Sequence, residues 1–597
     1  MAAINDRLVL LLLGSVFCIV QSSDEKFETS AKCAQSDLDG LLSFKSLIVE
    51  DRSEILKSWS GDACCAAWEG VECDSKTNRV VKLELQNRAE WNETIVMRGT
   101  LSPSLAKLEF LEVLVVNGFR EIKGSIPSSI GNLRRLKQLY LENNKLTGII
   151  PPSIGKLTQL QTLSLNGNRF VGPIPDGIGE LRQLIQINLA KNRLNGSIPV
   201  TVQNLPSLQF FDLNDNLISG PLPPFLGSLQ SLTFLDFSRN NLSGKIPAAL
   251  GNLSNAMTLS LAGNQLTGKI PSTLARLASL SSLSLNENFL DGTIPESLSN
   301  MSKLWYMNLS RNFLSDPLPA SLANASALLS LDLSHNKFNL GRIPAWIASK
   351  EMTDVHLAGC GIAGRLADWK PSATSMFTSI DLSDNSLTGE IGAVFANMSR
   401  LERIFLSNNY LKSNLSEMSF PEVIGAVDLH SNQLYGSIRK ILYDISGACS
   451  SPGGCLDYLD LSDNLISGTI PDLVDGERRL KFLDLSNNAL SGSIPWSILM
   501  LSSVRRLDLS GNRLEGKVPA SIGRLRELAW LDLSRNGFTG GLPVELLGLN
   551  NLKHVNFRYN HLCGEIPQGK TLTVFPVSAF LHNDCLCGTP LALCKKA

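Results

Sequence analysis

The 597-residue chain has almost no net charge: 54 Lys plus Arg stand against 55 Asp plus Glu, which gives −1 at pH 7. Proteins that bind nucleic acid or an anionic membrane surface need a surplus of cations to neutralise phosphates. The charge balance gives no support for either class of partner. We therefore expect no nucleic acid among the partners of this protein.

Long apolar runs and lipid-anchor signals are scarce as well. One apolar run, "LVLLLLGSVFCIV" (8–20), follows Arg7 and precedes small polar residues, which is typical of a secretory signal peptide. No later run reaches the roughly 18 residues of a membrane span, and the tail "CGTPLALCKKA" has no lipidation motif. We expect a signal peptide at 1–22 and a secreted mature chain without a transmembrane segment.

Motifs of common enzyme classes are missing. The sequence contains no G-x-S-x-G, no H-E-x-x-H and no phosphate-binding loop, and its six histidines are scattered. Aspartates recur in "LDLS" segments, and a pair of facing carboxylates is the catalytic device of glycosidases. Since "LDLS" belongs to a repeated template, we interpret them as solvated or locally hydrogen-bonded strand residues. We expect no enzyme activity, no cofactor and no metal, and a glycoside-active enzyme is disfavoured. The aspartates are Asp212, Asp236, Asp332, Asp381, Asp428, Asp460, Asp484, Asp508 and Asp532.

The sequence does contain one template that is repeated along most of its length. "LDLSRNNLSGKIP" (235–247) returns as "LSLAGNQLTGKIP" (259–271) and as "LDLSGNRLEGKVP" (507–519). The template asparagine recurs every 24 residues from 144 to 336, and again from 464 to 560 after an irregular middle. Twenty repeats result when the equivalent slots Arg88, Phe119, Cys360, Asn385, Asn409 and Asn432 are included. This regularity predicts a leucine-rich-repeat solenoid.

Each part of the template has a physical reason. In L-x-L the leucines alternate with polar residues, as in a short strand with one buried face, and one strand per repeat predicts a parallel β-sheet on the concave side. The asparagine carries a donor and an acceptor, so it can pair the backbone of the bend that follows each strand. Glycine and proline favour a turn and a non-helical return. We therefore expect short strands or 3₁₀ helices on the convex side.

The cysteines are consistent with an extracellular protein. Of twelve, Cys18 lies in the leader, four precede the repeats, four follow them, and Cys449 and Cys455 close the short loop "CSSPGGC". These ten can pair in an oxidising compartment, which leaves Cys360 over. Cys360 occupies an asparagine slot, where a small buried thiol fits. The alternative is a Cys-His nucleophile with His356, but His356 takes an outward slot and Cys360 an inward one.

Asparagine-linked glycosylation is a second indication of the secretory route. Nine N-x-S/T sequons occur, and glycans there would restrict the surfaces that a partner can touch. They lie at Asn92, Asn195, Asn241, Asn252, Asn300, Asn308, Asn324, Asn397 and Asn414.

The segment 32–85 carries a resemblance to a known family. Its helix, its Ser-Trp, its Cys-Cys and its W-x-G-V-x-C, together with the L-x-G-x-I-P of the repeats, resemble plant extracellular leucine-rich-repeat proteins: the secreted polygalacturonase inhibitors and the ectodomains of receptor-like proteins and kinases. This resemblance implies an N-terminal cap at 23–79, a solenoid at 80–567 and a C-terminal cap at 568–597. It also implies the disulfides Cys33–Cys64, Cys65–Cys73, Cys563–Cys585 and Cys587–Cys594. The chain departs from the inhibitors in having twenty repeats rather than about ten.

Candidate binding residues come from the outward slots. Several repeats place an aromatic residue ahead of the strand leucines, and exposed aromatics provide contact area at low entropic cost. Lateral packing against neighbouring repeats is the alternative explanation. His356 lies between two aspartate slots, and arginines mingle with the aspartates near the C-terminal end. The candidates are Phe210, Phe234, Tyr306, His356, Tyr458, Phe482, Trp530, Arg535 and Arg558.

The middle of the repeat array is irregular. The repeats after slots 360, 385, 409 and 432 lose the template proline, and the step from Asn432 to Asn464 is eight residues longer than the period. Because insertions in solenoids map to surface loops, we predict a protruding loop at about 439–455 that contacts a partner and is not needed for the fold. Drift at a tolerant loop is the alternative.

These observations predict a secreted glycoprotein that recognises another macromolecule in the cell wall or apoplast. The favoured partner is an extracellular protein or peptide, in defence or receptor signalling: a wall-degrading enzyme that the protein inhibits, or a receptor kinase. The alternative is a structural wall protein that bridges cell-wall polysaccharide.

Overall fold

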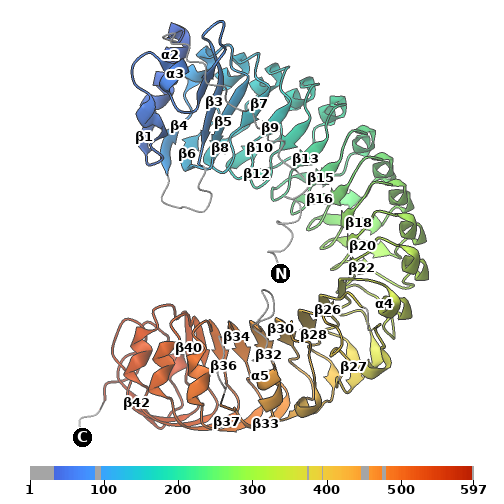
Figure 1. The fold of residues 1–597 in the computed structure, drawn as a ribbon, viewed down its shortest axis with the longest axis vertical. Coiled ribbons are helices and arrows are strands. Elements are labelled where there is room, and N and C mark those ends of the chain that lie inside the picture. The colour runs from blue at the N-terminus through green and yellow to red at the C-terminus, as the bar shows by residue number, and fades with distance from the viewer. Residues whose placement is uncertain are drawn as a thin grey trace, which may run out of the picture.

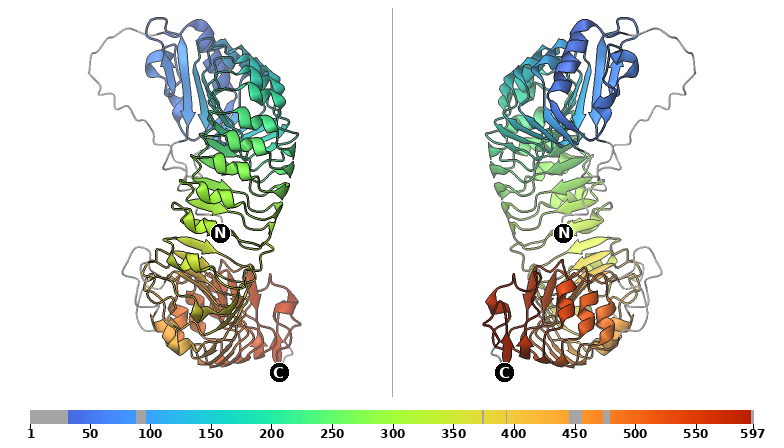
Figure 2. Two further views of the ribbon diagram at one scale, coloured as in Figure 1. Left: turned by 90° about the vertical axis from the view of Figure 1, so that its right-hand side faces the viewer. Right: turned by 90° about the vertical axis from the view of Figure 1, so that its left-hand side faces the viewer.

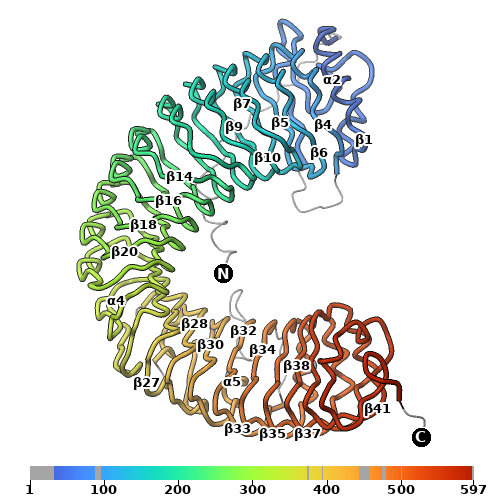
Figure 3. Tube along the Cα trace, turned by 180° about the vertical axis from the view of Figure 1, so that it is seen from behind, coloured from blue at the N-terminus to red at the C-terminus, as the bar shows by residue number. Residues whose placement is uncertain are grey.

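The structure, a computed structural model, describes residues 32–87, 96–372, 375–392, 394–444, 456–472 and 479–594. Figure 1 shows these residues as one curved body whose repeats follow one another from the N-terminal end (blue) to the C-terminal end (red). The side views of Figure 2 show the N-terminal repeats at the top and the C-terminal repeats at the bottom, and the tube in Figure 3 shows each repeat as one coil of the chain. The predicted leucine-rich-repeat solenoid is confirmed.

The L-x-L segments form one long sheet along the inner side of the arc (Figure 1). Its strands pair in chain order and in parallel, apart from an antiparallel pair between the first two. Equivalent residues face each other, so that Leu235 lies opposite Leu259 and Leu259 opposite Leu283. The strands are β2 Val71–Cys73, β3 Val80–Gln86, β5 Val113–Asn117, β7 Gln138–Tyr140, β9 Thr162–Ser164, β11 Gln186–Asn188, β13 Phe210–Asp212, β15 Phe234–Asp236, β17 Thr258–Ser260, β19 Ser282–Ser284, β21 Tyr306–Asn308, β23 Ser330–Asp332, β24 Asp354–His356, β26 Ser379–Asp381, β28 Arg403–Phe405, β30 Ala426–Asp428, β32 Tyr458–Asp460, β34 Phe482–Asp484, β36 Arg506–Asp508, β38 Trp530–Asp532 and β40 His554–Asn556.

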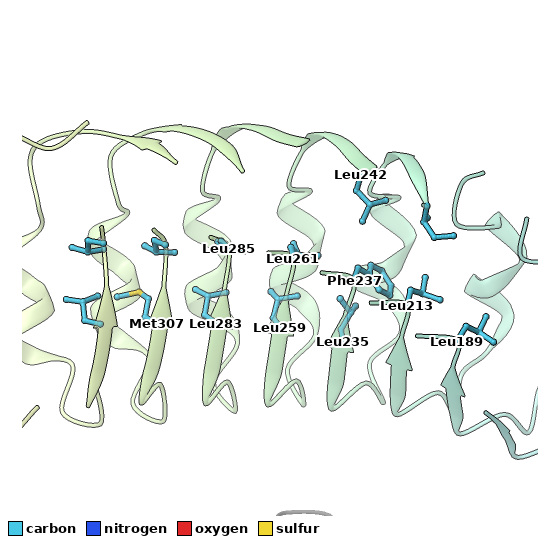
Figure 4. Close-up of a cluster of buried hydrophobic side chains, with 14 of the residues drawn as sticks. Leu189, Leu213, Leu235, Phe237, Leu242, Leu259, Leu261, Leu283, Leu285 and Met307 are labelled. Carbon is cyan, nitrogen blue, oxygen red and sulfur yellow. The ribbon is translucent and has the colours of Figure 1, made fainter. Parts of the chain in front are cut away.

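A second series of short strands lies beside the long sheet, at the top of Figure 4. Apart from β1, which precedes the repeats, these strands follow the asparagine slots. Most of these strands pair in parallel with the equivalent strand of the next repeat. They are β1 Ile48–Asp51, β4 Met97–Thr100, β6 Arg120–Gly124, β8 Lys145–Gly148, β10 Arg169–Gly172, β12 Arg193–Leu194, β14 Ser219–Pro221, β16 Asn241–Lys245, β18 Gln265–Lys269, β20 Phe289–Gly292, β22 Phe313–Leu314, β25 Ala363–Arg365, β27 Ser386–Gly389, β29 Tyr410–Leu411, β31 Tyr435–Gly436, β33 Leu465–Thr469, β35 Ala489–Gly492, β37 Arg513–Lys517, β39 Gly537–Gly540, β41 His561–Glu565 and β42 Cys585–Cys587.

The return segments form 3₁₀ helices on the outer edge of the arc (Figure 1), as expected for the convex side. The template proline precedes most of them, as Pro247 precedes η8, and its fixed φ suits an extended entry. They are η1 Ile55–Ser58, η2 Pro103–Lys107, η3 Ser128–Asn132, η4 Pro152–Lys156, η5 Asp176–Glu180, η6 Val200–Asn204, η7 Pro224–Ser228, η8 Ala248–Asn252, η9 Ser272–Arg276, η10 Glu296–Asn300, η11 Ala320–Asn324, η12 Leu366–Asp368, η13 Leu415–Glu417, η14 Trp496–Met500, η15 Ala520–Arg524, η16 Val544–Gly548 and η17 Val577–Ala579. The α-helices among the described residues are α2 Gln35–Ser46, α3 Cys64–Ala67, α4 Ala345–Ser349 and α5 Arg439–Asp444.

The core is a set of leucine rows that run from repeat to repeat. Figure 4 shows Leu235, Leu259 and Leu283 of the long sheet in one row and Leu261 and Leu285 in the next, between the strands and the helices behind them. All of these leucines are fully or almost fully buried. Burying such a side chain contributes about 1.5–3 kcal/mol, so each repeat is stabilised mainly by its contacts with the neighbouring repeats.

The template asparagines form a ladder of hydrogen bonds between repeats. In a representative repeat, the Nδ2 of Asn264 donates to the carbonyl oxygens of Phe237, Leu261 and Ala262 at 3.0, 3.1 and 3.2 Å. Its Oδ1 accepts from the Leu242 amide of the previous repeat at 3.0 Å. One side chain therefore pairs backbone groups of two repeats that would otherwise be buried without partners.

Disulfides and buried aromatics close the two ends. The structure forms the four disulfides implied by the family resemblance, namely Cys33–Cys64, Cys65–Cys73, Cys563–Cys585 and Cys587–Cys594. Cys449 and Cys455 lie outside the described residues.

The N-terminal end also contains a buried ion pair. Both carboxylate oxygens of Asp37 accept hydrogen bonds from the Arg79 guanidinium, at 2.8 and 2.9 Å. The Val80 amide donates to the same carboxylate at 2.8 Å, which ties helix α2 to the start of β3. Trp59 stacks on Trp68 nearby, with ring centroids 5.2 Å apart.

The insert of the irregular middle differs from the prediction. Residues 439–444, the first part of the predicted protruding loop, form helix α5. Ile441 and Leu442 are buried in the core, because the run "IRKILYD" places apolar residues on one side of a helix. The prediction of a protruding loop is therefore wrong for residues 439–444. Residues 445–455 lie outside the described residues.

Within the part of the chain that the structure describes, no helix has both the length and the apolar character that crossing a membrane requires.

Candidate partner-binding surface

The concave sheet presents two columns of side chains to solvent. In a three-residue strand such as β15, Leu235 points into the core, and Phe234 and Asp236 point outward on either side of it. We call these positions the first and the second outward slot. Because the strands pair in register, equal slots of successive repeats lie next to one another and form columns. The character of the concave face is therefore set by what each repeat places in these slots.

Two of the predicted aromatics in the first slot pack against each other. The rings of Phe210 and Phe234 are stacked with centroids 4.3 Å apart and an angle of 5° between their planes. Tyr306 instead contacts Trp305, its neighbour in the chain, with centroids 5.8 Å apart. All three predicted residues are half-buried. These side chains pack against another ring and also keep part of their surface in solvent. Both explanations offered for the aromatics therefore hold.

A longer stack covers the C-terminal part of the concave face, and we call it the stacked column. Tyr458 and Phe482 stack with centroids 4.2 Å apart, and Trp530 and His554 stack with centroids 3.6 Å apart. The guanidinium carbon of Arg506 joins the two pairs, 5.1 Å from the Phe482 centroid and 4.5 Å from the Trp530 centroid. The column therefore continues over five successive strands, β32 to β40, and each member keeps part of its surface in solvent.

Carboxylates of the second slot hold the stacked column in place. Arg506 Nη2 lies 3.1 Å from Asp484 Oδ2 and 3.5 Å from Asp508 Oδ2. Trp530 donates from Nε1 to the same Asp508 oxygen at 3.4 Å. A guanidinium that is flanked by two rings and anchored by two carboxylates has little freedom, so the column is a preorganised surface.

The second-slot aspartates of this region form the acid column, which comprises Asp460, Asp484, Asp508 and Asp532. All four are buried, with 4–8% of each residue exposed. The carboxylates accept hydrogen bonds from the strand's own following serine: Ser462 donates to Asp460 from its amide at 3.0 Å and from its hydroxyl at 2.6 Å. Of the two interpretations offered for these residues, local hydrogen bonding is correct and solvation is not.

Burial changes the protonation of several aspartates. Desolvation, followed by the repulsion of Asp484, raises the pKa of Asp508 to about 6, and desolvation with the nearby Asp236 raises the pKa of Asp212 to about 7. The pKa of Asp460 is raised for the same reason. Since burial favours the neutral form of a carboxyl group, part of the acid column carries less negative charge than its sequence suggests.

The region also contains one group of metal-ligand type. Asp428, His430 and Asp460 bring three ligand atoms within 4.8 Å of one another. His430 Nδ1 lies 2.7 Å from Asp428 Oδ1, and this hydrogen bond raises the pKa of the imidazole. The contact replaces the serine–aspartate bond of other repeats, because His430 stands where they have serine. The same arrangement is explained by hydrogen bonding alone.

His356 lies where its slot predicted. It stands in the second outward slot between Asp332 and Asp381 of the neighbouring strands. Its Nε2 is 3.0 Å from the hydroxyl of Ser379, and the side chain is half-buried. His356 is far along the sheet from the stacked column, separated from it by strands β26, β28 and β30.

The predicted arginines Arg535 and Arg558 meet at one exposed tyrosine. Their guanidinium carbons lie 5.6 and 5.7 Å from the ring centroid of Tyr559. The ring of Tyr559 stacks on His582 at 4.3 Å. These side chains lie in the bends that follow β38 and β40 and extend the candidate surface toward the C-terminal end.

Cys360 is buried and unpaired. Its Sγ lies 3.4 Å from the Leu333 carbonyl oxygen, which is the ladder contact that asparagines make in other repeats. Burial, together with nearby carboxylates such as Asp332, raises the pKa of the thiol to about 12. The ladder interpretation of Cys360 therefore holds, and the geometry does not support a nucleophile paired with His356.

The sequons leave one part of the molecule without a glycosylation motif. Asn252, Asn300 and Asn324 end the helices η8, η10 and η11 on the convex side, whereas Asn308 lies in a concave strand. Asn92 lies outside the described residues. No sequon follows Asn414, so the strands β32 to β40 and the stacked column carry none.

Sequence analysis did not assign two members of the stacked column. Arg506 counted only among the arginines that mingle with the aspartates near the C-terminal end, and His554 only among the scattered histidines, because the candidates for the first outward slot were aromatic residues. A comparison of all residues in that slot, from Tyr458 onward, finds both, since the period is regular there.

Comparison with known protein families agrees with this architecture. The model of a leucine-rich repeat region matches residues 93–220 and 200–428, which is more than half of the chain. The leucine-rich-repeat N-terminal domain matches residues 34–74. Single leucine-rich repeats match residues 455–476, 479–501, 503–525 and 527–549.

Curated relatives match over short stretches. Receptor-like protein EIX2 of Solanum lycopersicum is 33% identical over 141 residues, which are 23% of this chain and 13% of that protein. Phytosulfokine receptor 1 of Arabidopsis thaliana is 36% identical over 141 residues, again 23% of this chain and 13% of that protein. The polygalacturonase inhibitor of Vitis vinifera is 30% identical over 133 residues, 22% of this chain and 37% of the inhibitor. The matched stretches thus span well under half of each relative.

Solved structures match over most of the chain. The structure of PEPR1 with AtPEP1 is 28% identical and covers 89% of this chain and 80% of that one, with a TM-score of 0.60. The Arabidopsis receptor kinase HAESA, solved with the peptide hormone IDA and the co-receptor SERK1, is 30% identical and covers 94% of this chain and 100% of that one, with a TM-score of 0.59. The repeat ladder, the end disulfides and these matches lead to one conclusion: the chain belongs to the leucine-rich-repeat family and is similar to the ectodomains of plant leucine-rich-repeat receptors.

Proposed function

We propose that this protein recognises an extracellular protein or peptide through the C-terminal part of its concave face. The observation that carries the proposal is the stacked column, in which Arg506 joins two ring pairs across five strands. Large, rigid and half-exposed side chains of this kind dominate the energetics of protein interfaces. A partner that binds there covers a preformed surface, so little side-chain ordering opposes binding.

One further observation supports this location, and another supports a peptide or a protein segment as the ligand. The strands of the stacked column carry no sequon, so glycans attached at the predicted sites would leave it open. The matched structure of HAESA was solved with the peptide hormone IDA, which makes a peptide or a protein segment a reasonable ligand class for a similar solenoid.

Secretion is part of the proposal. It is supported by the apolar leader at 8–20, by disulfides at both ends of the solenoid and by the nine sequons. A binding role rather than catalysis is proposed because the buried aspartates bond to their own serines and Cys360 is buried with a raised pKa. Inhibition of a wall-degrading enzyme is a second candidate, supported by the match to the polygalacturonase inhibitor.

The test is selection of ligands from a phage-displayed library of random peptides on the secreted, glycosylated protein. The affinity of the selected peptides is then measured for Trp530→Ala, which removes the ring between Arg506 and His554 from the stacked column. We expect this variant to bind about 30-fold more weakly or worse, since an interface hot spot is worth about 2 kcal/mol or more.

Trp496→Ala is the matched control. Trp496 begins helix η14 on the convex side and is 63% exposed, so it is the same residue type on the opposite face. Equal losses in both variants, or selected peptides that Trp530→Ala still binds fully, would contradict the proposed location. Retention of the wild-type protein on immobilised pectin without any selected peptide would favour the wall-bridging alternative.

A further inference from the structure

We propose that the ligand of the C-terminal concave surface is an acidic peptide segment, bound by cations that surround the stacked column. This inference rests on the proposed function, because it names the chemistry of the partner at the same surface. It goes beyond it by predicting which peptides the surface selects.

The first observation is a difference in depth between cations and acids. Arg505 and Lys553 directly precede the first outward slots of β36 and β40, and both are exposed. Arg535, in the bend after β38, is exposed as well. The aspartates of the same repeats, Asp508 and Asp532, keep only 6% and 8% of their surface. A ligand therefore meets these cations before it meets Asp508 and Asp532.

The second observation is that these cations lack acidic partners. Among the residues that the structure describes, Arg505, Arg535, Lys553 and Arg558 have no carboxylate within 4.0 Å, whereas Arg506 is held by two. Four unpaired cations close to a sequon-free surface create a positive potential that attracts anions over about one Debye length. Arginine also binds carboxylates with two parallel hydrogen bonds, which favours Asp and Glu side chains.

The third observation separates a peptide from an anionic polysaccharide. Sugar rings pack on the faces of aromatic side chains, but Phe482 lies between Tyr458 and Arg506, and Trp530 lies between Arg506 and His554, so neighbours occupy both faces of these two rings. Ring edges are what remains for a ligand. Edges carry the positive end of the aromatic quadrupole and suit carbonyl and carboxylate oxygens, of which an acidic peptide offers many.

The test uses two readouts. The peptides selected on the wild-type protein are sequenced, and we expect Asp and Glu to be enriched among them. A fluorescent peptide of six glutamates is then titrated by anisotropy at low and high salt, with a peptide of six glutamines beside it. We expect the glutamate peptide alone to bind, and its affinity to fall as salt is added.

The variant pair Arg535→Glu with Arg558→Glu reverses two cations next to the surface. We expect it to bind the glutamate peptide about tenfold more weakly or worse, since like charges then face the ligand. The matched control is Arg513→Glu with Lys517→Glu, which reverses two exposed cations of β37 in the same part of the solenoid but outside the concave sheet. The control should retain binding within about twofold.

The outcomes separate this inference from the proposed function. Selected peptides that lose binding to Trp530→Ala but show no acidic enrichment would overturn the inference and leave the proposed function standing. Equal losses of affinity in the two charge-reversed variants would also overturn it. So would competition in which neutral peptides displace the glutamate peptide and acidic peptides do not. If polygalacturonate binds and the glutamate peptide does not, the surface takes an anionic polysaccharide instead. Failure to select any peptide counts against both proposals.

Discussion

Two stretches of the concave sheet have the same backbone and different side chains. Strands β17 and β19 pair in the same parallel register as β34 and β36, yet they fill their outward slots with Thr258, Ser260, Ser282 and Ser284. The C-terminal strands fill them with the stacked column over buried acids. Because β17 and β19 stack without any large outward side chain, the fold does not require one. The stacked column is therefore an addition to the solenoid, which is what a binding surface is expected to be.

The asparagine ladder should be equally important in both stretches. Asn264 and Asn512 make the same four hydrogen bonds, three from Nδ2 to carbonyl oxygens and one from a backbone amide to Oδ1. We expect Asn264→Ala and Asn512→Ala each to lower the free energy of unfolding by about 3–4 kcal/mol, because several buried backbone groups lose their partner. Urea denaturation measures this. A large difference between the two variants would mean that the two stretches are not structurally equivalent.

The pH dependence of stability should differ between two buried aspartates, Asp212 of β13 and Asp508 of β36. A carboxyl whose pKa is raised on folding, above its ordinary value of about 3.9, stabilises the protein fully at low pH and loses that contribution as the pH rises through the folded value. For Asp212 the folded pKa is about 7, so we expect the wild type to lose about 3 kcal/mol relative to Asp212→Asn between pH 5 and pH 8. For Asp508, at about 6, the loss relative to Asp508→Asn should be about half as large.

Denaturation of the wild type and both variants at the two pH values tests this difference. Asp176→Asn is the control, since Asp176 is exposed at the start of helix η5. If the wild type instead became more stable than Asp212→Asn as the pH rises, folding would favour the ionised form of Asp212.

Replacing an aromatic of the stacked column by the residue that β17 has in the same slot should affect binding more than folding. Phe482→Thr copies the slot of Thr258 and removes one ring of a stacked pair. We expect the free energy of unfolding to fall by about 1 kcal/mol, which is what an aromatic pair contributes. The free energy of binding the selected peptides should fall by more. Thermal melting and peptide titration on the same preparation compare the two, and a loss of stability that exceeds the loss of affinity would contradict the comparison.

Cys360, in the irregular middle between the two stretches, should show no effect in the native state. Its thiol is buried and its pKa is about 12, so reactive thiolate is scarce at neutral pH. We expect a thiol-specific reagent to leave the native protein unlabelled and to label Cys360 after denaturation, as read by peptide mass spectrometry. Rapid labelling of the native protein would mean that the ladder opens at this repeat.

The sequence by itself determined the repeat, because the 24-residue period of leucine, asparagine and proline specifies burial, backbone pairing and turn at each position. It therefore predicted the concave sheet, the 3₁₀ helices such as η8 and the ladder role of Cys360 before any coordinates. It also singled out Phe482 and Trp530, since their slot is fixed by the period. Where the period failed, so did the prediction: the run at 439–444 forms α5, because tertiary packing rewards the burial of Ile441 and Leu442.

Only the tertiary structure decided how neighbouring repeats use their outward slots. Whether Asp508 is solvated or buried, and whether Arg506 is free or held between two rings, depends on side chains about 24 residues away in sequence and one strand away in space. No pattern within one repeat predicts such a contact, because each of the two residues would fit its own repeat without the other. The stacked column and the raised pKa of the buried aspartates arise from the lateral stacking of repeats, which brings these side chains together and removes water from between them.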